Sequence, residues 1–223
     1  MSKLYIIPTP VGNLGDITHR AVEVLGKVDF LLAEDTRKTG ILLKHLGMQI
    51  KMYPHHSFNE HKTLESIIEK LLSGSVAGLV SDAGTPSVSD PGFLLVRECI
   101  KNAIEIECLP GATAFIPALV LSGLPSDRFC FEGFLPVKKG RKTRLESLKE
   151  ETRTMIFYEA PHKLLKTLED LAAIFGPERQ ASVSREISKI HEETIRGSLQ
   201  EILNYYSEHT LKGEITLVVA GKN

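Results

Sequence analysis

The sequence predicts an α/β fold built from two α/β domains. Short apolar runs that suit buried strands alternate with longer segments whose apolar residues recur every three or four positions, as in amphipathic helices. Several runs end in loops rich in Gly, Pro, Ser and Asp, and in open α/β sheets such loops at the strands' carboxyl ends form the ligand site. The pattern breaks at a linker-like segment, 122–127, so we expect domains at 1–123 and 124–223.

Strands and helices are expected to alternate along the first domain. The expected strands are 4–7, 30–33, 50–53, 76–80 and 104–109. The expected helices carry their apolar faces within 17–28, 41–46, 64–72, 91–102 and 114–121. Asp16 and Asp90 are placed to cap two of these helices, and Pro91 suits a first helical position.

The loop at 81–92 is the stretch around which the chain is organised. It contains Ser-Asp-x-Gly twice and exceeds the roughly two to six residues usual between a strand and a helix. Gly84 and the nearby serines have small side chains, so the backbone groups beside them can face a polar ligand. Pro- and Gly-rich loops also follow the first strand at 8–16 and the fifth strand at 110–114. We expect all three loops at one edge of a parallel sheet.

Two other strand ends carry residues whose roles the sequence leaves open. Glu34-Asp35-Thr36-Arg37 follows the second strand, and Asp35 either belongs to a site or only caps the next helix. Three basic residues of that helix are expected on a solvated face: Lys38, Lys44 and His45. The third strand is followed by three histidines: His55, His56 and His61. Their spacing fits no closed metal site, so we expect no metal, and this loop is either solvated or in contact with a substrate.

The second half of the chain opens with a strand at 129–134 and then a dense basic run. Five of the seven residues at 138–144 are basic: Lys138, Lys139, Arg141, Lys142 and Arg144. This run is either a solvated loop or a nucleic-acid contact. Further strands are expected at 154–158, 181–184, 194–197 and 214–220, with helices from 164 and over 199–206.

The composition of the 223 residues is that of an ordinary globular protein, with 42% apolar and 25% charged residues. The formal net charge of −1 means that the surface as a whole does not attract nucleic acid, so any such affinity needs a local basic patch. Three scattered cysteines, Cys99, Cys108 and Cys130, predict reduced thiols without a zinc site. With no signal peptide and no run of membrane length, a cytoplasmic protein is expected.

Several motifs together resemble the tetrapyrrole-methylase superfamily, and more narrowly its ribosomal RNA small-subunit methyltransferase I branch. The motifs span nearly the whole chain: 8–16, 33–37, 81–92, 131–136, 158–162 and 185–186. The resemblance implies two α/β domains with S-adenosylmethionine in the cleft between them, and a homodimer. It also implies methylation of a cytidine ribose 2′-oxygen in the decoding region of 16S rRNA. Many members continue into a C-terminal helical extension, and this sequence ends at Asn223, so we expect any RNA contacts of that extension to be absent or replaced.

The resemblance also implies site residues. The positions that match the cofactor loops are Pro10, Gly12, Asp82, Gly84, Thr85, Pro86, Ser89, Asp90, Gly111, Ala112 and Thr113. Gly and Pro let backbone groups approach such a cofactor closely. We assign Asp82 to a polar group of the cofactor and the Pro110-Gly111 turn to its adenosine. RNA contacts are assigned to Arg37 and to the five basic residues between 138 and 144.

A ribose hydroxyl becomes a good nucleophile only when its proton leaves, so a general base is plausible. The sequence leaves four candidates open: Glu34, Asp35, His55 and Glu159. Water as the proton acceptor is the other possibility. Two other functions also stay open at this point, namely methylation of a tetrapyrrole or another small molecule, and a non-catalytic role in ribosome assembly.

Overall fold

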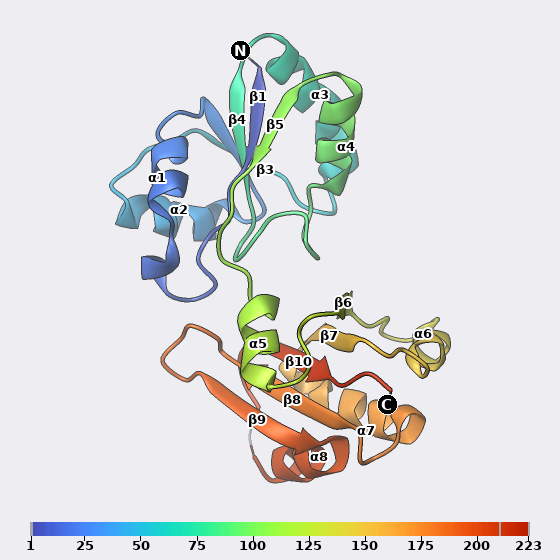
Figure 1. Ribbon diagram of the computed structural model, residues 1–223. Helices are drawn as coiled ribbons and strands as arrows, with labels where there is room; N and C mark the ends of the chain where they lie inside the picture. Colours follow the sequence, from blue (N-terminus) through green and yellow to red (C-terminus); the bar gives the residue numbers. More distant parts are fainter. Residues whose placement is uncertain (1, 210, 223) are drawn as a thin grey trace. The chain divides into compact units, whose positions relative to one another are not determined.

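The computed structural model describes residues 2–209 and 211–222, and the chain divides into two compact units that join between Thr113 and Ala114 (Figure 1). Each unit contains a five-stranded sheet. The prediction of two α/β domains is therefore confirmed.

The first unit is built on a parallel sheet with the strand order β3-β2-β4-β1-β5. The strands are β1 (Lys3–Ile6), β2 (Phe30–Ala33), β3 (Met52–Pro54), β4 (Val76–Val80) and β5 (Glu105–Cys108). All four neighbouring pairs are parallel. The carboxyl ends of these strands consequently lie along one edge of the sheet, which is where the site loops begin.

Two helices cover each face of this sheet (Figure 1). On one face, α1 (His19–Leu25) and α2 (Thr36–His45) share a core with buried strand residues such as Leu31. On the other face, α3 (Glu60–Leu72) and α4 (Phe93–Lys101) share a core with Leu32 and Leu79. Strands covered on both sides require nearly continuous apolar residues, as β2 and β4 have.

The second unit has a mixed sheet with the order β6-β7-β10-β8-β9. Its strands are β6 (Phe129–Phe134), β7 (Thr154–Glu159), β8 (Gln180–Arg185), β9 (Glu193–Ser198) and β10 (Ile215–Val219). Only the β6 and β7 pair of these described neighbours is parallel. The helices α6 (Arg141–Leu148), α7 (Leu164–Phe175) and α8 (Leu199–Glu208) share one core with this sheet.

The helix α5 (Phe115–Ser122) belongs to the second unit, whereas the sequence places the domain boundary after it, at residue 123. Ala118 and Leu119 are buried against Ile156 and Val218, which lie on the strands β7 and β10. The helix therefore packs on the second sheet, on the face not covered by α6, α7 and α8. The break in pattern at 122–127 marks the turn into β6, not the division between the units.

Two expected helix caps are wrong, and the structure shows what replaces each. Residues 14–16 form a short 3-10 helix, and the Thr18 hydroxyl oxygen, not Asp16, accepts the Ala21 amide at the start of α1 (3.0 Å). α4 begins after Gly92, not after Asp90. The Glu60 carboxylate at the start of α3 accepts the amides of Gly92 (3.2 Å) and Leu94 (3.3 Å), so an acidic group from another helix satisfies these first donors.

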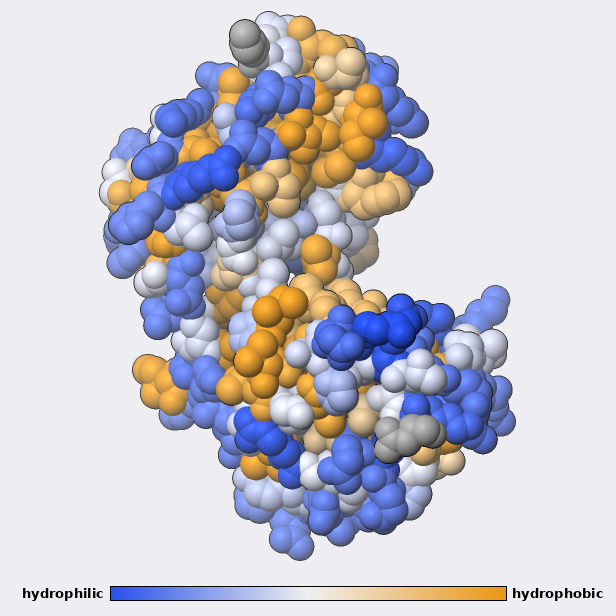
Figure 2. Space-filling view, viewed as in Figure 1, coloured by the Kyte–Doolittle hydropathy of each residue, from blue (hydrophilic) through white to orange (hydrophobic). Residues whose placement is uncertain are grey.

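Apolar side chains reach the surface at two helices in the view of Figure 2, over α4 and over α5. Phe93 and Ile100 are the exposed apolar residues of α4, and Ile116 and Val120 are those of α5. No helix in the described part of the chain is long and apolar enough to cross a membrane.

Gly78→Ala is expected to destabilise the first unit by about 1–3 kcal/mol, because it overfills a packed core. A Cβ at this position of β4 would lie 2.6 Å from Leu31 Cδ2 and 2.9 Å from Ile7 Cδ1. Gly26→Ala is the control: its Cβ would meet nothing nearer than 3.5 Å, and its φ of −72° suits alanine. Urea unfolding of both variants measures the difference, and equal midpoints would contradict this account of β4.

Candidate functional site

The three loops that follow β1, β4 and β5 are joined to one another, as the sequence predicts. Thr9 and Gly84 exchange two backbone hydrogen bonds of 2.9 Å each. The Thr9 hydroxyl also donates to the Ser81 carbonyl (3.1 Å), and the Thr85 hydroxyl donates to the Ala112 carbonyl (3.1 Å). These bonds bring three of the predicted cofactor positions, Gly84, Thr85 and Ala112, together at the carboxyl edge of the sheet.

The small residues of these loops are required by the backbone. Gly84, Ser87 and Ser89 all have positive φ, at 80°, 71° and 64°. A Cβ at Gly111 would lie 2.6 Å from the Cβ of Pro8, so only glycine lets the β5 loop pack this closely on the β1 loop. Two serines in the left-handed region within one loop indicate backbone strain of the kind found at ligand sites.

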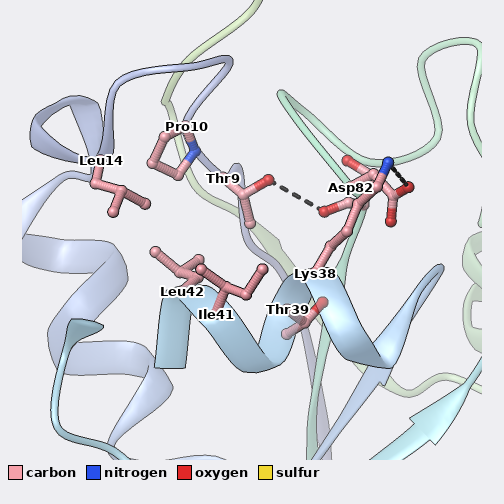
Figure 3. A pocket seen from close by; sticks show the side chains of 9 residues that line it. Thr9, Pro10, Leu14, Lys38, Thr39, Ile41, Leu42 and Asp82 are labelled. Carbon is pink, nitrogen blue, oxygen red and sulfur yellow. Dashed lines mark hydrogen bonds and ion pairs between the residues drawn. The ribbon is translucent and has the colours of Figure 1, made fainter. Parts of the chain in front are cut away.

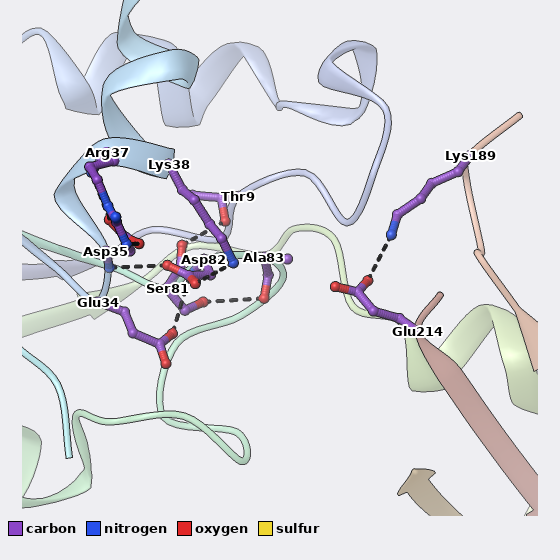
Figure 4. Close-up of polar contacts among 10 residues, drawn as sticks. All are labelled: Thr9, Glu34, Asp35, Arg37, Lys38, Ser81, Asp82, Ala83, Lys189 and Glu214. Atoms are coloured by element: carbon purple, nitrogen blue, oxygen red, sulfur yellow. Dashed lines mark hydrogen bonds and ion pairs between the residues drawn. The ribbon is translucent and has the colours of Figure 1, made fainter. Parts of the chain in front are cut away.

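Asp82 connects the β4 loop to the end of β2 (Figure 4). Its carboxylate accepts the Asp35 amide (3.0 Å) and pairs with the Lys38 ammonium (2.7 Å), while its own amide donates to Glu34 (3.3 Å). Lys38 lies on an exposed face of α2, as expected, with its side chain 60% exposed, but it also reaches the site loops through its pair with Asp82. The signal that could have identified Lys38 is its place in the first turn of a helix that directly follows a strand end.

Asp35 caps α2, which is one of the two roles that the sequence leaves open for it. Its carboxylate accepts the Arg37 amide (2.9 Å) and is held by the Arg37 guanidinium at 3.0 and 2.6 Å. The hydrogen bonds from Arg37 hold the pKa of this carboxyl well below its usual range. Asp35 is consequently a weak proton acceptor.

Negative charge concentrates where these loops meet. Burial, and secondarily the nearby Glu34 carboxylate, raise the pKa of Asp90 to about 6. Asp82 adds a further unfavourable interaction with Asp90. Glu34, Asp82 and Asp90 thus bring three carboxyl groups together, and Asp82 pairs with the Lys38 ammonium (2.7 Å). Such a group favours a ligand that carries positive charge.

His55 is an unsuitable base. Its ring is buried, with Nδ1 lying 3.3 Å from the Thr63 hydroxyl oxygen, and burial lowers the pKa of the ring. Among the residues that the structure describes, no group of three or more His, Cys, Asp or Glu side chains is placed to hold a metal ion.

Glu159 lies in the second unit and is 6% exposed. One carboxylate oxygen accepts the Ala160 amide (2.8 Å), and the other accepts the Thr167 hydroxyl (2.6 Å). The Arg141 guanidinium donates to the same hydroxyl oxygen (2.7 Å), which completes a buried chain of hydrogen bonds. This arrangement is typical of a structural network, because both oxygens already have donors.

The basic run divides into two classes of residue. Arg141 pairs with Asp170 (2.9 Å) at the start of α6, and Arg144 pairs with Glu132 of β6. These two arginines hold α6 to its surroundings. The lysines of the run are exposed, and of them Lys142 makes a long pair of 3.7 Å with Glu146.

A pocket opens beside the loops in the first unit, between the β1 loop and α2 (Figure 3). It is lined by Thr9, Pro10, Leu14, Lys38, Thr39, Ile41, Leu42, Ser81 and Asp82. Of these, only Pro10 and Asp82 are positions to which the sequence assigns a site role.

Comparison with known proteins gives a consistent result. Residues 3–203 match the family model of the tetrapyrrole (corrin/porphyrin) methylases. The chain is 51% identical over 222 residues to the ribosomal RNA small subunit methyltransferase I of Synechocystis sp., covering 99% of this chain and 80% of that protein. It is 43% identical to the protein of the same name from Thermotoga maritima, with 100% of both chains covered.

Solved structures share the fold. A uroporphyrin-III-C-methyltransferase from Thermus thermophilus matches with a TM-score of 0.70 at 22% identity, over 99% of this chain and 94% of that chain. A complex of uroporphyrin-III C-methyltransferase from the same organism with S-adenosylhomocysteine matches with a TM-score of 0.69 at 15% identity, over 98% and 97%.

The pH dependence of stability tests the crowding of carboxylates. Because the pKa of Asp90 is raised to about 6, the folded protein between about pH 4 and pH 6 keeps a proton that the unfolded chain has released. The free energy of unfolding should therefore fall as pH rises through this window. Because Asp90→Asn cannot ionise at this position, its free energy of unfolding should not show this fall. Above pH 6 it should exceed that of the wild type. Urea unfolding without ligand at several pH values measures this, and parallel curves for the two proteins would contradict the raised pKa.

Proposed function

The chain belongs to the tetrapyrrole (corrin/porphyrin) methylases and, within them, to the ribosomal RNA small subunit methyltransferase I group, and we propose that it methylates a cytidine ribose 2′-oxygen in the decoding region of 16S rRNA. The protein is an S-adenosylmethionine-dependent methyltransferase, as its relatives' name and family indicate. The same resemblance supports a homodimer that acts on the small ribosomal subunit in the cytoplasm. The solved neighbours act on tetrapyrroles by their titles, but at 22% identity or less that likeness extends to the fold alone.

The observation that carries the proposal is that hydrogen bonds join the loops after β1, β4 and β5, and that three carboxyl groups, Glu34, Asp82 and Asp90, lie close together beside them. S-adenosylmethionine supplies an activated methyl group on a sulfonium and carries a cationic ammonium as well. The charge group of Glu34, Asp82 and Asp90 suits such a cation, since a nearby positive charge would lower the raised pKa of Asp90. We propose that backbone groups at Gly84, Thr85 and the 111–113 turn hold the rest of the cofactor.

Glu34 is the proposed general base. Of its two carboxylate oxygens, one accepts the Asp82 amide at 3.3 Å, which orients the group at the carboxyl edge of the sheet. Asp35 is neutralised by Arg37, His55 is buried, and both oxygens of Glu159 have donors within the second unit. Glu34 is thus the candidate best able to take the proton of a ribose hydroxyl.

Incubation of the protein with S-adenosylmethionine and 30S subunits is expected to place a methyl group on one ribose 2′-oxygen of 16S rRNA. Glu34→Gln should lower kcat by about 100-fold or more, because it removes the proton acceptor. Asp35→Asn is the matched control: the amide keeps an oxygen that can cap α2, and kcat should fall by less than about tenfold. Mapping of 2′-O-methyl marks and single-turnover rates are the measurements. Unmodified rRNA with the wild type would contradict the function, whereas an active Glu34→Gln would contradict only the base.

The exposed lysines of the basic run are the proposed phosphate contacts: Lys138, Lys139 and Lys142. Arg141 and Arg144 are engaged by Asp170 and Glu132, so their guanidinium groups are less available than the sequence suggests. Arg37 is likewise held by Asp35, although its side chain is 88% exposed, and it keeps room for a phosphate. Lysine contacts of this kind position an RNA and do not select a base.

Changing Lys138, Lys139 and Lys142 to alanine together is expected to weaken binding to 30S subunits. The slope of log K against log salt should become less steep by about 2, because fewer phosphates are contacted. Cofactor affinity should stay unchanged, since the loops of the first unit are untouched. The control variant changes three exposed lysines elsewhere, Lys27, Lys62 and Lys212, and removes the same charge. Equal salt slopes for the two triple variants would mean that the run is only a solvated surface.

A further inference from the structure

The pocket beside α2 has two unlike sides (Figure 3). One side is apolar and is formed by Pro10 and Leu14 of the β1 loop and by Ile41 and Leu42 of α2. Ile41 is 66% exposed, so an apolar side chain stands at the mouth of the pocket. A flat ring laid on this surface would cover apolar area that otherwise contacts water.

The other side is polar and is formed by Thr9, Lys38, Thr39 and Asp82 (Figure 3). Thr39 is 5% exposed, and its hydroxyl oxygen has no hydrogen-bond partner among the described residues. A buried hydroxyl without a partner is unfavourable, so it favours a ligand atom that bonds to it. The ion pair of Lys38 with Asp82 presents one strong donor and one strong acceptor beside it.

The pocket borders the β1 and β4 loops through Pro10 and Asp82, but its lining does not include Gly84, Thr85 or the 111–113 turn. β4, β1 and β5 are consecutive in the sheet, and their loops carry Gly84, Thr85 and the 111–113 turn. The pocket instead lies toward β2, because four of its lining residues come from α2, the helix that follows that strand. Asp82 lies between the two regions and also bonds to Glu34, the proposed base.

We propose that this pocket receives the pyrimidine base of the nucleotide whose ribose is methylated, an inference that rests on the proposed function. The base lies against Ile41 and Leu14, and its polar edge meets the Lys38 and Asp82 pair and the Thr39 hydroxyl. The carboxylate of Asp82 accepts the exocyclic amine of a cytosine, and the ammonium of Lys38 donates to its ring carbonyl or ring nitrogen. A base held in this pocket is taken out of its stack, as happens in enzymes that do chemistry on a base.

The first test compares Ile41→Ala with Ile100→Ala. Ile100 is the matched control because it is 67% exposed and lies on α4, away from the pocket. Ile41→Ala should raise the Kd for 30S subunits, measured without cofactor, by about fivefold, since an apolar contact with the base is lost. Ile100→Ala should leave this Kd unchanged. Calorimetric titration with S-adenosylmethionine should give the same Kd for both variants and the wild type.

The second test uses the buried hydroxyl. Thr39→Val keeps the shape of the side chain and removes a hydroxyl to which no described residue bonds, so the melting temperature should stay the same or rise. The Kd for 30S subunits should nevertheless increase by about fivefold, and Thr39→Ser, which restores the hydroxyl, should recover most of it. A purely structural role for Thr39 would move the melting temperature instead.

The outcomes separate this inference from the function on which it rests. A wild type that leaves 16S rRNA unmodified overturns both. An active wild type whose Ile41→Ala and Thr39→Val variants bind 30S subunits normally overturns the base pocket alone. Variants that lose affinity for S-adenosylmethionine also overturn it, because the pocket would then belong to the cofactor.

Discussion

The paired backbone hydrogen bonds between Thr9 and Gly84 are the constraint on which the site depends. They join the loops of two adjacent parallel strands, which otherwise diverge toward helices on different faces of the sheet. Gly84 can make this pair because it tolerates a φ of 80°, and Thr9 adds a side-chain bond to Ser81. Once these loops are joined, Asp82 is held where it reaches the end of β2, and three carboxyl groups from two loops, Glu34, Asp82 and Asp90, come together.

The concentration of carboxylates has an energetic cost that a cationic ligand offsets. Asp90 keeps its proton to about pH 6 because its ionised form is poorly solvated and lies near Glu34. Lys38 compensates only part of this charge, since it pairs with Asp82. Positive φ angles at Ser87 and Ser89 add backbone strain in the same loop. A site arranged in this way is less stable when empty and gains stability when a cofactor with positive charge binds.

Most of the fold and the three loops could be predicted from the sequence, because apolar periodicity and Gly-Pro loops are local signals. Two of the features that the sequence does not predict are contacts between distant parts of the chain. Glu60 caps α4 from another helix, and the pairing of Lys38 with Asp82 requires β2 and β4 to be neighbours in the sheet. Strand order cannot be read from local pattern. The sequence does not predict the helix α6, because only two of its residues, Leu145 and Leu148, are buried and they lie among basic residues.

The division of the basic run shows why charge count alone overstates an RNA surface. Arg141 reaches Asp170, Thr167 and the Pro136 carbonyl, a set of partners that suits the planar fork of a guanidinium. The lysines of the same run, with compact and strongly hydrated charges, stay at the surface, where they suit phosphates. Phosphate contacts of this kind hold any RNA. The choice of nucleotide must then come from contacts to a base, and the pocket beside α2 offers for that purpose an apolar surface and the Thr39 hydroxyl, which has no partner among the described residues.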